Sequence, residues 1–477
     1  MYKIIKYKYV ALLSAFMAAT SCKVPNLVNV KNNTALPKRY NESADSANTA
    51  NQQWRTFFTD PSLVALIDTA LQNNQELLMT LQEVEIAKND IRAKTGDILP
   101  SLNGRLGVGL EKVGRYTSSG AGDATTDIEP GKKTPDPLPD YTGAIDARWE
   151  ADIWKKLHNA KKAAVARYLG TIEGKNFVLS SLIAEVANSY YELLALDNQL
   201  MIVQQNISLQ NNSLEIIKVQ KEASRVTELA VQQFQAEVYN SKSLAFSIRQ
   251  QIKETENKIN FLLGRYPQQI VREAGNFVNL NPALLKQGLP SQLLENRPDI
   301  KQAELALEAA KLDAKVARAE FFPSLEIGAS VGLQAFKPTY LTKLPESILY
   351  SLAGDLAGPL INKNAIRAEF ASANARQLQA LYNYQKVILN AYFEVANQVS
   401  NIDNLSKSYD LKQLEVNTLM KSVDISSDLF NAARADYLEV LTAQRDALSA
   451  KLELVETKKS QFNAVVNMYK ELGGGWK

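Results

Sequence analysis

The chain has 477 residues, a formal net charge of +3 and a hydrophobic fraction of 45%, which is ordinary for a folded protein. Its only histidine is His158 and its only cysteine is Cys22, so a disulfide framework and a metal site of the His/Cys type are excluded. The charge is spread along the chain without a basic stripe. We therefore predict no nucleic-acid partner, no metal and no cofactor.

Residues 1–21 have the features of a secretory signal peptide. Lysines at positions 3, 6 and 8 precede an apolar core at 10–19, and small residues lead to Cys22. This arrangement resembles a bacterial lipoprotein cleavage site, so we expect Cys22 to carry a lipid anchor. The alternative is an incidental thiol beside an ordinary signal peptide. Residues 22–60 are polar and rich in asparagine, which predicts a lipidated tether rather than a domain.

The rest of the chain contains a tandem duplication. Asn73 aligns with Asn296, 223 positions later, within a helix, proline and strand pattern that occurs in both copies. Further along the offset falls to 209, which places Leu263-Gly264 on Leu472-Gly473. We predict a first repeat at residues 61–266, a connecting segment at 267–296 and a second repeat at 297–477.

Each repeat is expected to begin with a helix. In the first repeat, Asp60-Pro61 provides an N-cap followed by proline at the first helical position, and apolar residues then recur at helical spacing to about residue 95. The connecting segment 267–296 contains several prolines and a glycine. We expect it to be irregular and to pack beside the N-terminal tether, around the middle of the helices.

Four segments alternate apolar and polar residues, as strands with two different faces do. They lie at about residues 99–113, 141–153, 323–335 and 347–360, with aromatic residues near their ends. Two half-buried hairpins of a soluble sheet would show the same alternation. The secretion signal and the long loop at 117–140 favour membrane strands instead. Four strands cannot close a barrel, and lipid tolerates no open sheet edge, so the strands must be pooled between subunits.

The remaining segments predict very long helices. Residues 154–220 and 363–430 run almost without helix breakers, for about 100 Å each at 1.5 Å per residue. Shorter helices return at 225–263 and 434–471. A narrow apolar stripe at spacings of three and four residues favours coiled-coil packing with a wet outer surface. A rod without a lumen is the alternative, but the strands at one end favour a hollow cylinder.

Four motifs carry a family resemblance. They are Arg-Pro-Asp-Ile at 297–300, Ala-Arg-Ala-Glu-Phe-Phe-Pro-Ser-Leu at 317–325, a Trp-x-x-Phe-x-x-Asp-Pro pattern from position 54, and Leu-Gly-Gly-Gly-Trp at 472–476. Together they resemble a TolC-like outer membrane factor, in the lipoprotein subgroup that serves resistance-nodulation-division efflux pumps. The match covers nearly all of the chain after the signal peptide.

The resemblance implies an α+β membrane channel built as a homotrimer. Three tandem-duplicated protomers with four strands each would give a 12-stranded β-barrel, continued by a periplasmic α-helical barrel. Such a channel is lipid-anchored in the outer membrane, with most of its mass in the periplasm. It is a passive duct for drugs or other small molecules, and its partners are a periplasmic adaptor protein, an inner-membrane transporter and outer membrane lipid.

The resemblance also implies particular site residues. The family closes its tunnel just after the turn into the last helix, in a pattern like Tyr-Leu-x-Val-Leu-Asp-Ala-Gln, and residues 437–444 match it. The implied periplasmic gate is Leu438, Glu439 and Thr442, with Thr442 in place of the usual aspartate. The implied adaptor-contacting tips of the helical hairpins are Ser224, Arg225, Arg434 and Asp436. Both turns lack the glycine that is usual in the family.

Three other functions are alternatives to efflux. An enzyme would need convergent nucleophile, base or metal groups, whereas the acidic residues here recur at helical intervals among Lys and Asn, so we predict no catalysis. A type I protein-secretion channel uses the same architecture, and a structural or adhesive surface lipoprotein would need no lumen. Efflux is preferred because the motifs at 297–300 and 472–476 resemble the drug-efflux branch. The transported substrate does not follow from the sequence.

Overall fold

The structure is a computed structural model that describes residues 25–28, 36–40, 47–273, 277–283, 285–359, 361 and 363–477. The predicted signal peptide and its lipidation residue Cys22 lie outside these residues. Within the described ranges, no helix combines the length and the hydropathy that crossing a bilayer requires.

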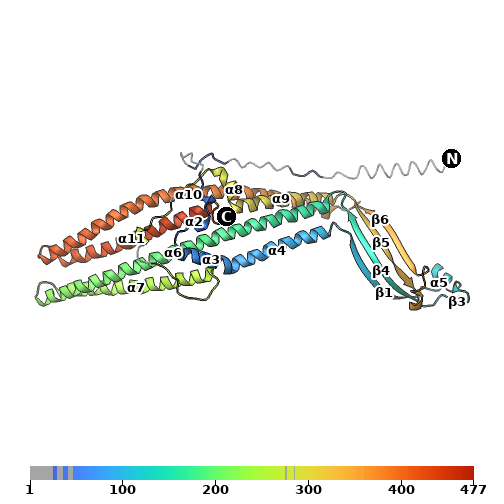
Figure 1. Cartoon of the computed structure of the whole chain (residues 1–477), viewed down its shortest axis with the longest axis horizontal. Coiled ribbons are helices and arrows are strands. Elements are labelled where there is room, and N and C mark those ends of the chain that lie inside the picture. Colours follow the sequence, from blue (N-terminus) through green and yellow to red (C-terminus); the bar gives the residue numbers. More distant parts are fainter. Residues whose placement is uncertain are drawn as a thin grey trace. The chain divides into compact units, whose positions relative to one another are not determined.

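The chain divides into two compact units. Unit 1 consists of Met1–Asn32, Glu85–Leu169 and Leu305–Tyr382. Unit 2 consists of Asn33–Val84, Gly170–Glu304 and Asn383–Lys477. Each unit therefore takes segments from both predicted repeats, and the longest helices run from one unit into the other (Figure 1).

Unit 1 contains a four-stranded antiparallel sheet in the order β1-β4-β5-β6. The strands are β1 (Ser101–Glu111), β4 (Leu138–Ala151), β5 (Ser324–Ala335) and β6 (Ile348–Ala357). Each overlaps a strand expected from the alternating pattern, with ends that differ by at most three residues. The edge strands are β1 and β6, one from each repeat.

The loop between β1 and β4 is more ordered than its composition indicates. It holds helix α5 (Ser118–Asp123) and a small hairpin of β2 (Asp127–Glu129) and β3 (Lys132–Lys133). A third short element, η4 (Pro338–Tyr340), lies in the loop between β5 and β6. None of these three elements was predicted, because short Gly/Thr/Pro-rich segments carry no hydrophobic period.

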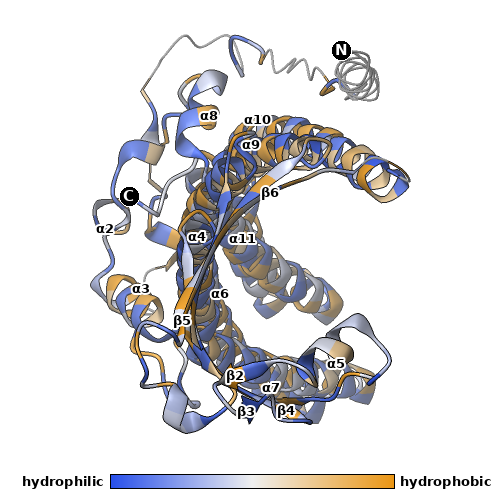
Figure 2. Cartoon of the chain, turned by 90° about the vertical axis from the view of Figure 1, so that its right-hand side faces the viewer, coloured by the Kyte–Doolittle hydropathy of each residue, from blue (hydrophilic) through white to orange (hydrophobic). Residues whose placement is uncertain are grey.

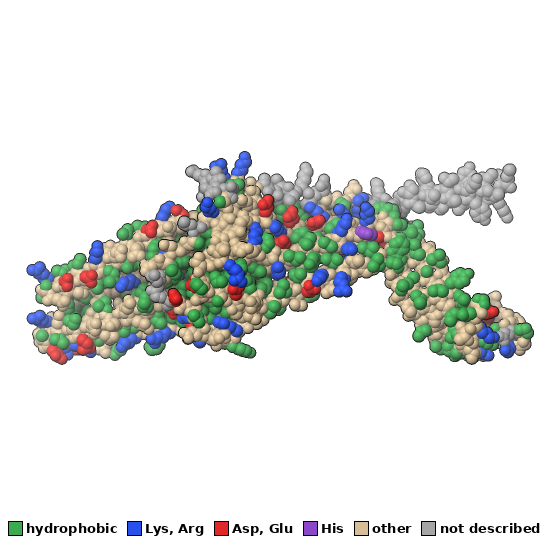
Figure 3. Space-filling view, viewed as in Figure 1, with side chains coloured by type: hydrophobic (Ala, Val, Ile, Leu, Met, Phe, Trp, Pro, Cys, Tyr) green, Lys and Arg blue, Asp and Glu red, His purple; other side chains and the backbone are tan. Residues whose placement is uncertain are grey.

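The two faces of the sheet differ in polarity. On one face Leu106 is 93% exposed and Leu352 is 79% exposed, and hydrophobic side chains gather over the strands in Figure 3. On the other face Arg105 Nε lies 3.3 Å from Asp146 Oδ2 across the β1–β4 pair. The alternation of the sequence is thus reproduced in space, with an apolar face left uncovered in the single chain.

Long helices make up most of the remaining chain. They are α6 (Lys156–Glu222), α7 (Glu228–Leu262), α10 (Asn364–Asn431) and α11 (Tyr437–Glu471). Helices α6 and α10 contain 67 and 68 residues. Hydrophobic and hydrophilic residues are interleaved along α10 and α11 in Figure 2, as expected for helices that bury only a narrow stripe.

The expected single helix at the start of the first repeat is in fact two helices, α3 (Pro61–Asn73) and α4 (Gln75–Gly96). The break is at Asn74, whose backbone is extended. Asn74 Oδ1 accepts the backbone N–H of Leu77 at 3.0 Å, so the side chain caps the start of α4. The second repeat breaks in the same way between α8 (Leu293–Asn296) and α9 (Pro298–Ala319).

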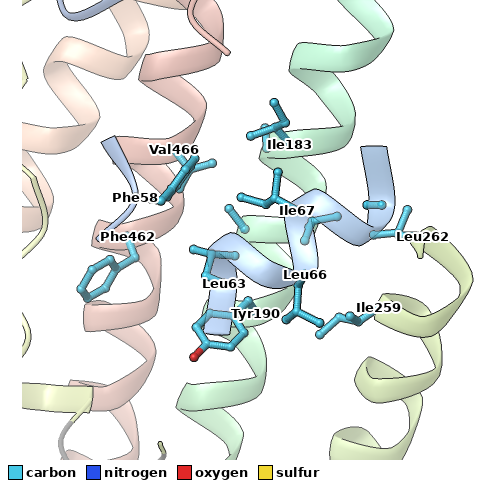
Figure 4. Packing of buried hydrophobic residues seen from close by; sticks show 14 of the residues in the cluster. Phe58, Leu63, Leu66, Ile67, Ile183, Tyr190, Ile259, Leu262, Phe462 and Val466 are labelled. Atoms are coloured by element: carbon cyan, nitrogen blue, oxygen red, sulfur yellow. The ribbon is translucent and has the colours of Figure 1, made fainter. Parts of the chain in front are cut away.

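Helix α3 anchors the main hydrophobic core of unit 2. Figure 4 shows Leu63, Leu66 and Ile67 pointing towards apolar side chains of α6, α7 and α11. Leu63 and Ile67 are fully buried, and burying a side chain of this size stabilises the fold by about 1.5–3 kcal/mol. Asp60 starts the helix, since its Oδ1 accepts from Ser62 N–H at 2.8 Å while its Oδ2 accepts from the Tyr190 hydroxyl at 2.7 Å.

The connecting segment packs beside the N-terminal tether, as expected. Its short elements are η2 (Phe277–Asn279) and η3 (Pro290–Gln292), and those of the tether are η1 (Thr49–Asn51) and α2 (Trp54–Phe57). Thr49 N–H donates to Lys286 O at 3.0 Å, and Asn48 and Gln287 form a β-bridge. Phe277 is buried against Phe462 of α11.

Candidate channel gate and docking tips

Two tip turns, at residues 223–227 and 432–436, join α6 to α7 and α10 to α11. In the first, Ser224 N–H donates to Lys221 O and Arg225 N–H donates to Gln220 O, both at 2.9 Å. In the second, Ala433 N–H donates to Phe430 O at 3.0 Å and Arg434 N–H to Leu429 O at 2.8 Å. This pair of bonds is the Schellman motif, which ends a helix through one left-handed residue.

The left-handed residues are Ser224, with φ of 58°, and Ala433, with φ of 55°. Glycine takes this conformation freely, whereas a Cβ makes it costly. The sequence showed that the turns lack the family's usual glycine, and the structure shows that the backbone keeps the glycine-like conformation nonetheless. Both turns therefore hold stored strain.

The four expected docking residues are all exposed in the described chain. Ser224 and Arg225 lie on the first tip turn, and Arg434 and Asp436 lie on the second. Beside them, Lys221 Nζ and Glu228 Oε2 lie 2.9 Å apart. The hydrogen bond to Glu228 raises the pKa of Lys221, and bonds from Gln232 and Lys221 lower the pKa of Glu228, so the turn keeps both charges at neutral pH.

The three expected gate residues lie on the first two turns of α11. Leu438 is 51% exposed, and Thr442, one helical turn further on, is half-buried. Glu439 has a local function that the sequence analysis missed: its Oε1 accepts the backbone N–H of Asp436 at 3.4 Å, within a capping box. The Asp-x-x-Glu spacing at 436–439 was the available signal. The Glu439 carboxylate therefore helps to cap the N-terminus of α11.

An apolar cluster lies beside the expected gate residues and connects the two hairpins. Its fully packed members are Leu214 and Ile217 of α6 and Ala230, Val231, Phe234 and Val238 of α7. Phe430, Tyr437 and Leu441 of the second hairpin pack against it. Tyr437 and Leu441 therefore point into the protein while the intervening Leu438 points out of it.

At their other ends, α7 and α11 finish with the same motif but with glycine. Gly264 has φ of 64° and Gly473 has φ of 91°. A Cβ on Gly264 would lie 2.3 Å from Asn73 O, and one on Gly473 would lie 2.5 Å from Asn296 O. The duplicated asparagines and glycines of the sequence thus meet in space. The fold needs glycine at both positions because the backbone is left-handed and because a Cβ would collide with the asparagine carbonyl oxygen.

The residue after each of these asparagines caps the C-terminal end of the same helix: Asn74 caps α7 and Arg297 caps α11. Asn74 Nδ2 donates to Leu262 O at 2.9 Å, and Arg297 Nη1 donates to Glu471 O at 3.1 Å. Arg297 is buried, and it also forms ion pairs with Asp299 at 2.7 Å and Glu394 at 2.8 Å. The Arg-Pro-Asp-Ile motif is therefore a structural clamp on the end of α11.

The comparisons with known proteins agree with this architecture. The family model described as outer membrane efflux protein matches residues 66–265 and 289–474. The chain belongs to the outer membrane efflux protein family. The predicted resemblance to a TolC-like outer membrane factor is confirmed, and so is the tandem-duplicated fold with its sheet and long helices. This efflux protein is a channel of the bacterial outer membrane.

Its relatives cover almost the whole chain. The pyoverdine export outer membrane protein OpmQ of Pseudomonas aeruginosa is 29% identical over 472 residues, which is 98% of this chain and 97% of the relative. The cation efflux system protein CusC of Escherichia coli K12 is 27% identical over 428 residues, 90% of each chain. A crystal structure of CusC superposes with a TM-score of 0.82 at 25% identity, covering 94% of this chain and 99% of that one. The open state of the Neisseria gonorrhoeae MtrE channel has the same fold, with a TM-score of 0.81 at 22% identity, covering 95% of this chain and 98% of MtrE.

Proposed function

We propose that three copies of this chain form one passive duct, the outer membrane component of a tripartite efflux pump. The observation that carries the proposal is the four-stranded sheet, whose edge strands β1 and β6 have no pairing partner on their outer sides among the described residues. A lipid-embedded sheet cannot keep such edges. Pairing β6 of one copy with β1 of the next supplies the missing hydrogen bonds at all three interfaces between copies. It closes the three sheets into one 12-stranded barrel.

The polarity of the sheet supports the same assembly. The uncovered apolar face, with Leu106 and Leu352, would contact lipid, and the face with the Arg105–Asp146 ion pair would line an aqueous lumen. The test is the mass of detergent-solubilised protein by light scattering after size exclusion. The proposal predicts a trimer, and a folded monomer would overturn it.

We further propose the remaining parts of the pump from the family resemblance. Leu438, Glu439 and Thr442 would form the periplasmic constriction, where threefold symmetry brings three copies of each residue to the axis. Ser224, Arg225, Arg434 and Asp436 would contact a periplasmic adaptor, since they are exposed polar groups of the tip turns. An inner-membrane transporter would supply the energy, and the duct itself would perform no catalysis.

The lipid anchor on Cys22 is also a proposal. Two or three acyl chains give stable membrane attachment where one does not. Intact mass spectrometry of the purified protein checks it: the expected N-terminus is an acylated Cys22, and any other N-terminus would contradict the proposal.

The relatives also bear on substrate choice. Their names mention pyoverdine, cations, solvents and toluene, which differ widely in chemistry. Since all are similar to this chain over most of its length, we propose that substrate selection lies mainly in the transporter rather than in the duct.

A further inference from the structure

Unit 2 contains a polar recess on the side of α6 that faces away from α3. Val186, Ala187 and Tyr190 of α6 belong to the core that α3 completes. Asn188, Ser189 and Glu192 point to a different side of the same helical turns, as a period of 3.6 residues requires. That side forms an open recess of about 570 Å³, flanked by α7 and α11. Its lining residues outside α6 include Gln251, Glu254, Lys258, Glu456, Lys459 and Asn463.

Both lysines of the recess are already neutralised by the protein. Lys459 Nζ lies 2.9 Å from Glu192 Oε2 and 2.7 Å from Glu456 Oε1. Lys258 Nζ lies 3.3 Å from Glu185 Oε1. Burial acts to lower the pKa of Lys459, but the hydrogen bonds to Glu456 and Glu192 outweigh it and raise that pKa above its ordinary value. The Lys459 ammonium group therefore stays charged. Both ammonium groups are engaged in ion pairs, so they leave little attraction for an anion.

The oxygen atoms of the recess are less well satisfied. Ser189 is only 4% exposed, yet its Oγ has no hydrogen-bond partner among the described residues. The same holds for Asn188 Oδ1 and Asn463 Oδ1. Glu254 Oε1 accepts from Gln250 Nε2 at 2.9 Å, and no cationic side chain within the described ranges pairs with this carboxylate. The buried oxygens of Asn188, Ser189 and Asn463 lack a donor, which is costly, and Glu254 adds an exposed negative charge. The site is therefore suited to a ligand that brings N–H donors and positive charge.

We propose that this recess is a binding site for small organic cations with primary or secondary ammonium groups. Its volume lies within the range of about 300–1,000 Å³ that is typical of small-molecule sites. In the part of the chain that the structure describes, no group of three or more His, Cys, Asp or Glu side chains is arranged to hold a metal ion, which favours an organic cation over a metal.

The duplication makes the site specific to one repeat. At the offset of 209, Glu254 corresponds to Asn463, Glu192 to Asn401 and Lys258 to Asn467. The charged side chains of the first repeat are thus replaced by amides in the second. We therefore expect one site per chain rather than two.

The inference rests on the proposed duct, in which the recess would open onto the lumen and hold a cation briefly during transit. A site on a conduction path must bind weakly enough to release its ligand. We accordingly expect rapid, reversible binding.

The experiment uses spermidine as the probe, titrated calorimetrically into the detergent-solubilised full-length protein. We expect one spermidine per chain. Glu254→Gln should raise the Kd about tenfold and Ser189→Ala about threefold, because each removes one acceptor and the first also removes charge. Both substitutions are close in size to the native residue.

The control for Glu254→Gln is Glu215→Gln, which removes an exposed carboxylate of α6 that pairs with Lys218 at 2.8 Å. It should leave the Kd unchanged. Equal loss of affinity in Glu215→Gln and Glu254→Gln would reveal diffuse attraction of cations and would overturn the site, as would unchanged binding in Glu254→Gln. Displacement of spermidine by Mg²⁺ beyond the effect of NaCl at equal ionic strength would also contradict an organic-cation site.

Conductance in planar bilayers, recorded without spermidine, separates this inference from the proposed duct. Channels that conduct normally but show no specific spermidine binding would refute the site alone. A protein that binds spermidine with the expected variant pattern but never conducts would refute the duct and leave the site standing.

Discussion

The long helices α6 and α10 and the returning helices α7 and α11 end in the same backbone motif, but the two sets of ends are secured differently. At the C-terminal ends of α7 and α11, Gly264 and Gly473 press against the main chain of Asn73 and Asn296. At the tip turns, Ser224 and Ala433 adopt the left-handed conformation on exposed turns. Gly264 and Gly473 are therefore clamped by tertiary contacts, whereas Ser224 and Ala433 are exposed and only neighbouring residues such as Val226 and Phe430 pack against the protein. We therefore propose that the tip turns are the part of the protein that moves when the proposed gate opens.

The largest effect is expected from placing a side chain in the clamped end. Gly473→Ala combines a left-handed φ of 91° with a Cβ that would lie 2.5 Å from Asn296 O. We expect a loss of about 3 kcal/mol or more, since the conformational cost alone is about 1–2 kcal/mol. Thermal unfolding of the purified protein measures it. Gly96→Ala, at a glycine with open space around it, is the control, and an equally small effect in both variants would contradict the clamp.

The second effect concerns the guanidinium of the clamp. Arg297→Leu leaves Glu394, Asp299 and the carbonyl of Glu471 without their buried donor. Breaking a buried ion pair on one side costs about 3–5 kcal/mol. Denaturant unfolding checks this expectation, with Arg376→Leu as the control because its ion pair with Glu369 is exposed. A cost below about 1 kcal/mol, typical of surface pairs, would show that Arg297 clamps nothing.

At the tip turns, in contrast, we expect substitutions that stabilise the protein. Ser224→Gly and Ala433→Gly relieve the left-handed strain without losing a tertiary contact, so each should stabilise the protein by about 1 kcal/mol. Differential scanning calorimetry of the single and double variants measures the gain. Destabilisation by either change would mean that the native side chain makes a contact that outweighs the strain.

The smallest expected effect is a pH dependence at the clamped end. Burial and the nearby charge of Glu394 raise the pKa of Glu471 in the folded state. A raised carboxyl pKa means that the protonated form is favoured in the folded protein, so its stabilisation is present at acid pH and is lost as the pH rises through the folded pKa. Glu471→Gln should therefore raise the melting temperature at pH 7.5 but not at pH 4. An equal shift at both pH values would exclude this explanation.

The sequence predicted the regular parts of the fold because their periods are strong. The alternation of apolar and polar residues located the ends of β5 to within one residue. The long segments without helix breakers located the ends of α6 and α10 to within two residues. It missed the break at Asn74, since asparagine within a helical pattern gives no warning that its side chain will bond to Leu262 in a helix far along the chain.

The functional residues divide along the same line. Leu438 and Glu439 were named through family resemblance, but the capping bond between Glu439 and Asp436 depends on local geometry. The recess around Ser189 and Glu254 was invisible to sequence analysis, because it exists only where α6, α7 and α11 meet. The hydrophobic period predicts which face of each helix is apolar. It does not predict that polar faces of three different helices meet and form a recess.

The most direct test of the account is the single-channel conductance of Leu438→Ala beside Leu229→Ala. Leu229 occupies the equivalent position in the first repeat, 209 residues earlier, and is 59% exposed where Leu438 is 51% exposed. Contacts within a ring of three leucines are worth at most about 1.5–3 kcal/mol each, so truncating all three should shift a closed-to-open equilibrium by tens of fold. We expect higher conductance for Leu438→Ala and native conductance for Leu229→Ala, with both trimers intact. Unchanged conductance in Leu438→Ala together with a lower melting temperature would show that Leu438 packs between helices, and it would contradict the gate.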